Sequence, residues 1–279
     1  MRLIFSRKGF DSESGGVPSP IFPTGRIVSL PIPQDSDIRF QDIAWESQNL
    51  GPLVEDLTKS RLQRGDGVHH DPDLRREAMP RQRGWLPAFG QAGAAQTHLS
   101  NQSVGKGDLF LFFGWFRRVH LQNGKWTCVP GTPDIHLIFG WLQVGEVYPL
   151  PGSRPPYWAG IHPHLNSDLK NNCLYIAKQT LELPGLRNRV NGGGAFPNFQ
   201  SVLQLTCPGR NRGIWLLPQW LNPAGRKSSL SYHGKKACWT QHADGALLEV
   251  VKKGQEFVLD CADYPEAIPW LSQLFEAAV

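Results

Sequence analysis

Residues 107–116 read GDLFLFFGWF and residues 135–147 read IHLIFGWLQVGEV, and these two stretches decide the fold. Both are short runs of aromatic and β-branched residues interrupted by glycine, a pattern typical of buried strands rather than helices. Each contains the tripeptide Phe-Gly-Trp, at 113–115 and at 139–141. Glycine inside a strand often marks a bulge or a point where another group approaches the backbone. We therefore predict two buried, neighbouring strands with such a feature at each glycine.

The tryptophans of the two tripeptides, Trp115 and Trp141, are candidate substrate-binding residues. Flat aromatic rings stack on nucleobases, so two Phe-Gly-Trp units on neighbouring strands could form a slot for a planar base. The alternative is that both rings fill a hydrophobic core, as most aromatic side chains of strands do. Spacing alone favours the core.

The composition bounds the class of protein. The chain has 279 residues, 40% hydrophobic and 19% charged, which is enough to bury a core and excludes a disordered protein. The net charge of +5 is compatible with a nucleic-acid partner but does not establish one. The five cysteines are scattered without a Cys-x-x-Cys pair, which favours a reducing compartment and disfavours a structural zinc site. With neither a signal peptide nor a membrane-spanning run, we expect a cytoplasmic protein with no membrane partner.

The remaining pattern predicts one elaborated α+β domain over residues 1–279. Further strands are expected at 3–5, 27–33, 173–177, 202–206, 214–217, 247–251 and 256–259, a hairpin at 121–129, and helices at 52–64, 91–99 and 265–277.

Part of this chain resembles PUA-like domains of the ASCH and EVE type. The resemblance is carried by AAQTHL at 94–99, VGKGDLFLF at 104–112 and GWLQVGEV at 140–147. It implies a mixed β-barrel core over roughly residues 85–180, elaborated with extra strands and a few short helices. Domains of this kind bind RNA or modified DNA bases in a pocket.

Nearly the whole chain resembles a second family, the bacterial and phage family called nucleotide modification associated domain, third type. The two Phe-Gly-Trp strands contribute to this resemblance, together with SRKGFD at 6–11, PSPI at 18–21, FGQAGAAQ at 89–96, SYHG at 231–234 and GQEFVLD at 254–260. That family is grouped by genomic association with DNA base modification. The resemblance implies a context rather than a reaction.

The loop after the first strand supplies a first group of candidate residues. Arg7, Lys8 and Asp11 are followed by two glycines and Ser19. Cations and glycine backbone amides suit a phosphate, and Arg7, Lys8 and Asp11 are candidate catalytic residues. The alternative is a salt-bridged anchor of the loop.

Two histidine-containing segments supply a second group. In HHDPD at 69–73, Asp71 and Asp73 are candidate catalytic carboxylates that could hold a divalent ion, or parts of a simple turn. His162 and His164 are separated by one proline and could contact a substrate, or could be hydrogen-bonded loop residues. We assign no metal ligand and no cofactor from the sequence.

The last candidates are acidic, imidazole and amide groups. His233 and Glu256 are possible general acid–base residues. Gln91 and Gln96 could read the edge of a base.

Together these features predict a protein of DNA-modification systems. We expect it to bind a nucleotide or a modified base in an aromatic pocket and to act on it enzymatically. The alternatives are a non-catalytic reader of modified DNA, and a metal-dependent nuclease that uses Asp11, Asp71 and Asp73.

Overall fold

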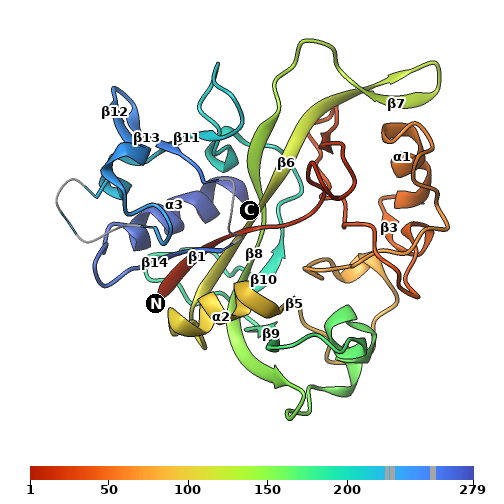
Figure 1. The fold of residues 1–279 in the computed structure, drawn as a ribbon, viewed down its shortest axis with the longest axis horizontal. Helices are drawn as coiled ribbons and strands as arrows, with labels where there is room; N and C mark the ends of the chain where they lie inside the picture. Colours follow the sequence, from red (N-terminus) through yellow and green to blue (C-terminus); the bar gives the residue numbers. More distant parts are fainter. Residues whose placement is uncertain (224–225, 227–229, 252–255) are drawn as a thin grey trace.

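A computed structural model describes residues 1–223, 226, 230–251 and 256–279 (Figure 1). It is a mixed α+β structure, as the sequence predicts, with most of its regular structure in strands. The strands are β1 (Arg2–Arg7), β2 (Ser19–Ile21), β3 (Ala44–Trp45), β4 (Gln48–Asn49), β5 (Ala88–Gln91), β6 (Leu109–Gln122), β7 (Lys125–Cys128), β8 (Ile135–Leu150), β9 (Asn172–Ala177), β10 (Gly193–Ala195), β11 (Ile214–Leu217), β12 (Trp239–His242), β13 (Gly245–Glu249) and β14 (Glu256–Asp260). The α-helices are α1 (Leu50–Leu57), α2 (Gly93–Asn101) and α3 (Ala267–Ala278).

The main sheet is built on the two strands that the sequence singles out. Its order is β14-β1-β6-β8-β9-β5, with β2 and β7 also paired to β6 and β10 paired to β8. Strand β1 is parallel to β6, and β6 and β8 are antiparallel. These two long strands run through the middle of the molecule (Figure 1). Because both strands are long, most of the other strands of the sheet pair with one of them: β1, β2 and β7 with β6, and β9 and β10 with β8.

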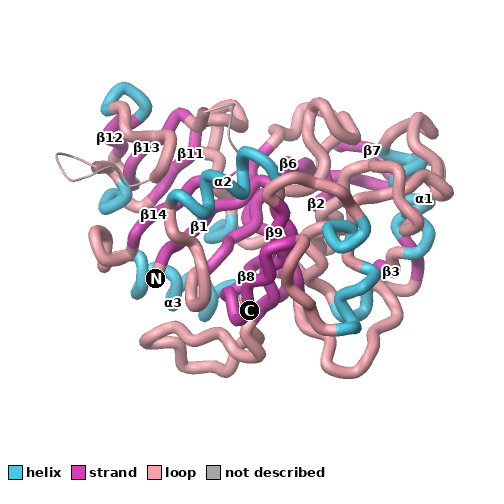
Figure 2. Tube along the Cα trace, turned by 60° about the horizontal axis from the view of Figure 1, so that its bottom comes forward, coloured by secondary structure: helices cyan, strands magenta, loops and turns pink. Residues whose placement is uncertain are grey.

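The expected barrel does not close in the described part of the chain. The sheet ends at β14 and at β5, which are not joined by backbone hydrogen bonds. Helix α2 contacts both β14 and β9, and Figure 2 shows it beside β1 and β14. The Tyr175 hydroxyl of β9 donates to Gln96 of α2, while His98 of α2 contacts Ser231. Side chains and a helix therefore bridge the opening where a barrel would have backbone pairing.

The glycines of the Phe-Gly-Trp units behave as the sequence predicts. The register between β6 and β8 shifts between Phe112 and Phe113, which is a bulge. A Cβ on Gly114 would lie 2.8 Å from the Lys8 carbonyl oxygen, and the Lys8 amide donates to the Phe113 carbonyl at 2.9 Å. The chain leaving β1 therefore rests directly on Gly114, which fixes the position of Lys8.

Local chemistry explains several element boundaries. Helix α1 begins earlier than expected because the Asn49 side chain accepts from the Gly51 amide at 2.9 Å, a typical N-cap. The hairpin β6–β7 turns at Asn123 and Gly124, both with positive φ, as a two-residue hairpin turn requires.

Two of the expected strands are wrong. Residues 27–33 form only isolated bridges, because Pro31 and Pro33 cannot donate to a ladder. Residues 202–206 fall in a 3-10 turn, Ser201–Leu203, followed by isolated bridges to Leu137 and Trp215.

The described residues pack around more than one core. The larger core lies under the main sheet and α3, and a second surrounds α1. The β11-β13-β12 sheet lies beside α3 on the opposite side of the molecule from α1 (Figure 1). None of the described helices has the length and apolar character needed to cross a membrane.

Candidate active site

A buried carboxylate links the two edges of the main sheet. Glu256, the first residue of β14, is 1% exposed. Its Oε1 atom accepts from Lys8 Nζ at 3.0 Å and from Gln91 Nε2 at 2.5 Å. Lys8 follows β1 directly and Gln91 ends β5. Three of the residues selected from the sequence are thus brought into direct contact.

The second oxygen of this carboxylate is unused. Glu256 Oε2 is buried and has no hydrogen-bond partner among the described residues. Ser6 pairs with Glu256 across β1 and β14, and its Oγ atom is also buried without a partner there. The Lys8 ammonium lies over the Phe89 ring, 4.7 Å from its centroid. Unpaired polar atoms of this kind are costly in a folded core and are frequent where a ligand binds.

Asp71 lies at the centre of a cluster of histidines. Its Oδ1 atom accepts from the Gly90 amide at 2.7 Å and lies 3.3 Å from His162 Nε2. Its Oδ2 atom faces His69 Nε2 at 3.8 Å and His164 Nε2 at 3.9 Å. The His162 contact is electrostatic rather than a well-aligned hydrogen bond, since His162 Nε2 has no hydrogen-bond partner among the described residues.

The backbone and an amide orient two of these imidazoles. His164 Nδ1 lies 2.6 Å from Asn172 Oδ1, and the Asn172 amide nitrogen donates to the His164 carbonyl at 2.7 Å. Because the Asn172 oxygen can only accept, the proton of neutral His164 sits on Nδ1. The Nε2 lone pair of His164 then faces Asp71. His162 Nδ1 accepts from the His164 amide at 3.4 Å, which places the proton of neutral His162 on Nε2.

Strand β5 joins the carboxylate of Glu256 to the histidine cluster. Its neighbouring residues Gly90 and Gln91 donate to Asp71 and to Glu256, respectively. A Cβ on Gly90 would lie 2.2 Å from ring atoms of His164, so only glycine permits this packing. The two groups of polar residues therefore form one continuous site.

Burial and nearby charges favour neutral imidazoles at His69 and His164 and a charged carboxylate at Asp71. Burial lowers the pKa of His69 to about 4, and the positive charge of Lys8 adds to the effect. Burial likewise lowers the pKa of His164. Burial acts to raise the pKa of Asp71, but the neighbouring imidazoles of His162, His164 and His69 outweigh it, so this pKa lies below its usual value. At neutral pH the site presents the neutral imidazoles of His69 and His164 to a carboxylate.

Asp73 belongs to a different cluster. Its carboxylate accepts two hydrogen bonds from Arg81, at 2.5 and 2.6 Å, and contacts His70 Nε2 at 3.1 Å. The Arg81 guanidinium stacks over the Trp85 ring at 4.3 Å. Burial acts to raise the pKa of Asp73, but His70 and Arg81 bring it down to about 2. Both carboxylate oxygens of Asp73 are therefore bound to Arg81, whereas Asp71 faces the histidine cluster.

The other residues of the first loop make structural contacts. The Asp11 carboxylate accepts from the Glu13 and Ser14 amides at 2.8 and 2.6 Å, which closes a turn. Ser19 Oγ accepts from the Leu30 amide at 3.1 Å. The Arg7 guanidinium donates to the Val251 carbonyl at 3.2 Å, and burial lowers its pKa.

The two tryptophans do not share one slot. Trp115 is opposite His136 and Trp141 is opposite Leu111, so their backbone positions are about 17 Å apart along β8. The Arg212 guanidinium covers Trp115 at 4.3 Å from the ring centroid. Trp141 donates to the Asn191 carbonyl at 2.9 Å and packs in the core against α3.

Two further candidates have structural partners. His233 Nδ1 lies 3.0 Å from the Ser231 carbonyl, and its Nε2 accepts from the Val251 amide at 3.2 Å. Burial lowers the pKa of His233. Gln96 bonds to Ser100 and Tyr175.

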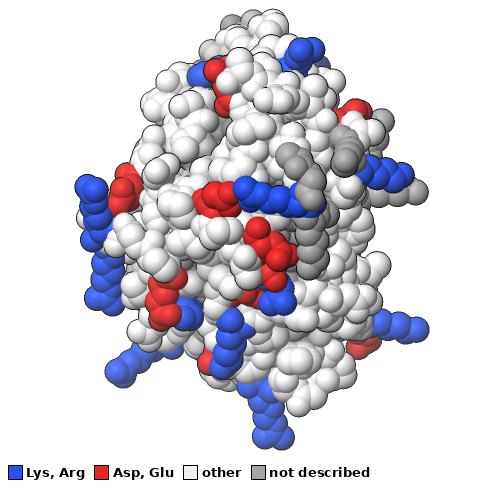
Figure 3. Space-filling view, turned by 90° about the vertical axis from the view of Figure 1, so that its left-hand side faces the viewer, with Lys and Arg blue, Asp and Glu red and all other residues white. Residues whose placement is uncertain are grey.

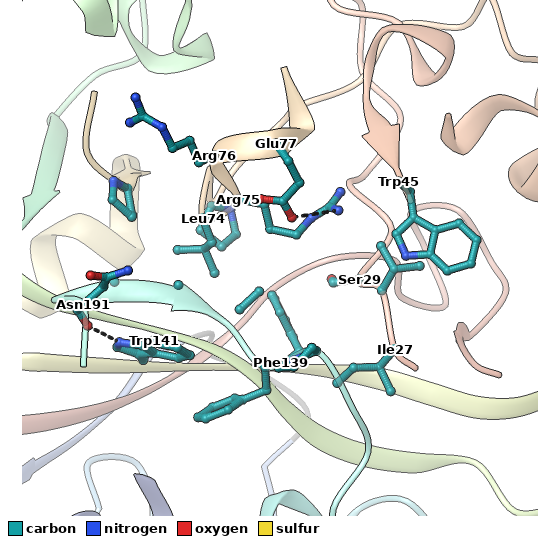
Figure 4. A pocket seen from close by; sticks show the side chains of 18 of the residues that line it. Ile27, Ser29, Trp45, Leu74, Arg75, Arg76, Glu77, Phe139, Trp141 and Asn191 are labelled. Carbon is teal, nitrogen blue, oxygen red and sulfur yellow. Dashed lines mark hydrogen bonds and ion pairs between the residues drawn. The ribbon is translucent and has the colours of Figure 1, made fainter. Parts of the chain in front are cut away.

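A pocket of about 670 Å³ adjoins the site (Figure 4). Figure 4 shows Phe139 and Trp141 on one side and Leu74 and Arg75 on the opposite side. Its lining extends to Asp71, to Pro72, and to Gly9, which follows Lys8. The pocket therefore reaches the margin of the polar site, and its lining includes the aromatic side chains of Trp45, Trp85, Phe139, Trp141 and Phe196.

Charge is mixed on the face drawn in Figure 3. Lys and Arg side chains alternate there with Asp and Glu, and the coloured residues show no single-sign patch on this face. The coloured residues of this face, which lies on the left of Figure 1, form no broad electrostatic track for a nucleic-acid backbone.

Sequence reasoning missed two members of the site. His69 was visible in the HHDPD segment but carries no feature that separates it from His70. Asn172 has no local signal at all, because its role depends on a contact with His164 across a loop.

No curated protein and no solved structure matches this chain. The model of one family, described as nucleotide modification associated domain 3, matches residues 2–260, which confirms the resemblance seen in the sequence: the chain belongs to this family.

Proposed function

We propose that this protein is an enzyme that modifies a nucleotide or a base of DNA, and that its reaction centre is the site around Glu256 and Asp71. Membership in the family associates the chain with nucleotide or DNA modification. The observation that supports catalysis most is the convergence of polar groups from five distant segments. They are Lys8, residues 69–71, residues 90–91, residues 162–164 and Glu256.

The adjoining pocket supports a nucleotide as the ligand. Its volume of about 670 Å³ is within the usual range for small-molecule sites. Phe139, Trp45 and Trp141 contribute aromatic surface on which a base can stack, and Arg76 contributes positive charge for a phosphate. A base bound there would lie beside Asp71. If the target lies in duplex DNA it must be flipped out, at a cost of a few kcal/mol.

Within this proposal, Glu256 is the acid–base residue and Lys8 its partner. Lys8 and Gln91 hold one oxygen, and we expect a substrate to take the other, Oε2, which has no hydrogen-bond partner among the described residues. Catalytic carboxylates are commonly held in this way by neighbouring groups that set their proton affinity.

The PUA-like relationship of residues 85–180 remains a proposal. The order β5, α2, β6 and β8, with α2 across the open side of the curled sheet, supports it.

The five cysteines are all free, which suits the cytoplasm as the proposed compartment.

Binding and turnover test the proposal separately. Calorimetry with deoxynucleoside mono- and triphosphates and with a short single-stranded oligonucleotide would measure binding. Mass spectrometry of the recovered nucleosides would detect a product. We expect Arg76→Ala to weaken binding, with the exposed Arg187→Ala as its matched control. We expect Glu256→Gln to keep binding and to lose product, with the exposed Glu146→Gln as control.

The outcomes separate the competing functions. Binding without any product by the wild-type protein would favour the non-catalytic reader. Absence of binding to every nucleotide and to the oligonucleotide would overturn the proposal. The nuclease interpretation is less well supported than the other two for Asp11 and Asp73, because Asp11 closes its own turn and Asp73 is held by Arg81.

A further inference from the structure

We propose that His69, Asp71 and His164 bind one divalent transition-metal ion. The ion's part in turnover rests on the proposed function, but its binding does not. The candidate ligand atoms all lie within 4.8 Å of one another, on side chains that are buried or nearly so. They come from two loops that strand β5 brings together through Gly90.

The two oxygens of Asp71 have different surroundings. Oδ1 accepts from the Gly90 amide at 2.7 Å and faces His162 at 3.3 Å. Oδ2 faces the Nε2 atoms of His69 and His164 at 3.8 and 3.9 Å, beyond hydrogen-bond distance. One oxygen is thus held by the protein, while the other and two imidazole nitrogens surround a common point. Metal-binding carboxylates are typically supported in this way by outer hydrogen bonds.

The hydrogen bonding of the two imidazoles also suits them to act as metal ligands. Asn172 holds the proton of His164 on Nδ1, which directs the Nε2 lone pair toward Oδ2. A hydrogen-bond acceptor on the ring nitrogen that faces away from the ion is the usual arrangement of a metal-bound histidine. His69 Nδ1 is buried and lacks a hydrogen-bond partner within the described chain, so no protein group prevents its Nε2 from acting as an acceptor.

The distances fit an ion after a small contraction. Ligands about 2.1 Å from a tetrahedral zinc ion are about 3.4 Å from one another. The separations of 3.8 and 3.9 Å from Oδ2 exceed that value by about half an ångström. Rotation of the His69 side chain, which is 12% exposed, can shorten its distance to Oδ2, and a small rotation of the Asp71 carboxylate can shorten the distance to His164.

The donor set selects the class of ion. Two imidazole nitrogens and one carboxylate suit zinc, iron(II), cobalt(II) or manganese(II), whereas magnesium and calcium prefer oxygen donors alone. Three protein ligands leave at least one position for water or substrate, the arrangement of a catalytic rather than a structural site. An ion there could activate water or polarise a ligand that enters from the pocket beside Asp71.

Direct metal binding tests this site without any assay of turnover. The untagged protein, freed of metal by dialysis against a chelator, would be titrated with Zn²⁺, Co²⁺, Mn²⁺ and Mg²⁺. We expect one equivalent of Zn²⁺ or Co²⁺ by elemental analysis, a visible absorption band with Co²⁺, a raised melting temperature and no comparable effect of Mg²⁺. Binding of no transition-metal ion by the folded wild-type protein would overturn the proposal.

Variants assign the ion to these residues. We expect His69→Gln and His164→Gln to lose the stoichiometric ion, whereas His242→Gln, on the far small sheet, keeps it. Asn172→Ala should weaken affinity by roughly 10- to 100-fold through the orientation of His164. Circular dichroism would establish folding, and His69→Gln, at the rim of the cluster, serves where His164→Gln is unstable. An ion retained by His69→Gln and His164→Gln alike would refute the assignment.

The two proposals can fail independently. An ion bound at His69 and His164 without nucleotide binding would sustain the metal site and overturn the proposed function. Nucleotide turnover that persists in the fully metal-free protein, together with the absence of ion binding, would do the reverse.

Discussion

The side chains of Gln91 and Glu256 meet although their strands are the two opposite edges of the main sheet. Gln91 Nε2 lies 2.5 Å from Glu256 Oε1, and the residues are separated by 165 positions in the chain. The sheet order places four strands between β5 and β14. The sheet must therefore curl until its edges touch, and the hydrogen bond that joins them lies within the candidate active site.

Removal of this contact should destabilise the fold measurably. In Gln91→Ala the Glu256 carboxylate loses one of its two donors, which should lower the free energy of unfolding by about 1–3 kcal/mol. Urea denaturation would measure the change. Gln241→Ala, on the exposed face of β12, should change stability by less than about 0.5 kcal/mol. Equal effects of the two substitutions would contradict the linking role of Gln91.

The Lys8–Glu256 pair should show strong coupling. Either Lys8→Met or Glu256→Gln leaves a buried polar or charged partner uncompensated, which typically costs about 3–5 kcal/mol. The double variant should be more stable than the sum of the single effects predicts. A double-mutant cycle by chemical denaturation would give the coupling energy, and additive effects would show that the charges interact weakly.

Asp73 should matter for stability in a way that an exposed ion pair does not. Asp73→Asn removes the carboxylate that receives two hydrogen bonds from buried Arg81, with an expected loss of about 3 kcal/mol. Glu55→Gln breaks a similar two-bond contact with Arg64 at the surface, and its effect should be clearly smaller. Differential scanning calorimetry of both variants would compare them. A loss for Glu55→Gln as large as that for Asp73→Asn would contradict the assignment.

Gly90 should tolerate no side chain. A Cβ there would lie 2.2 Å from the His164 ring, so Gly90→Ala must displace that imidazole and should lower both stability and Zn²⁺ affinity. A Cβ on Gly160 would contact nothing within 4 Å, so Gly160→Ala provides the matched control. Melting curves with and without Zn²⁺ would test both variants. Wild-type behaviour of Gly90→Ala would argue against the packing of His164 on β5.

Acid should destabilise the protein through buried neutral histidines. Burial, with the nearby charges of Arg7 and Arg212, lowers the pKa of His136 well below its usual value, and His136 Nδ1 accepts from Trp215 Nε1 at 2.9 Å. Because the folded pKa lies below the unfolded value, this contribution is complete above about pH 6.5 and is lost as the pH falls. Each such histidine lowers the free energy of unfolding by up to about 1.4 kcal/mol per pH unit.

Unfolding in urea at about pH 7.5 and about pH 5.5 would measure this loss, and NMR would follow the ring of His136. The ring should remain neutral as long as the protein is folded. Titration of His136 near its usual pKa in the folded protein would refute the prediction.

The sequence was most informative about features that depend on a short stretch of residues, such as single strands and close contacts at glycine. The runs around the Phe-Gly-Trp units identified β6 and β8, and the expected close approach at glycine is the contact of Gly114 with Lys8. Lys8, Gln91 and Glu256 were selected individually, and the structure brings them together. Their convergence was not predictable, because it depends on the curl of the sheet rather than on any one segment.

Candidates with similar or neighbouring sequence positions have different surroundings in the structure for the same physical reason. Trp115 and Trp141 lie in identical tripeptides, yet the bulge and the register of β6 and β8 place them far apart. Asp71 and Asp73 are two positions apart, but one faces His69 and His164 while the other faces Arg81. Spacing along the chain cannot reveal such partners, since each is supplied by a different loop.

The distance in sequence between Lys8 and Glu256 also has a kinetic consequence. The two residues are 248 positions apart, and β1 lies between a parallel partner, β6, and an antiparallel one, β14. Contacts of such separation slow folding, because long segments must be ordered before they form. During synthesis, Lys8 lacks its counter-ion until β14 has left the ribosome. The contacts around Glu256 can therefore form only after nearly the whole chain has been made.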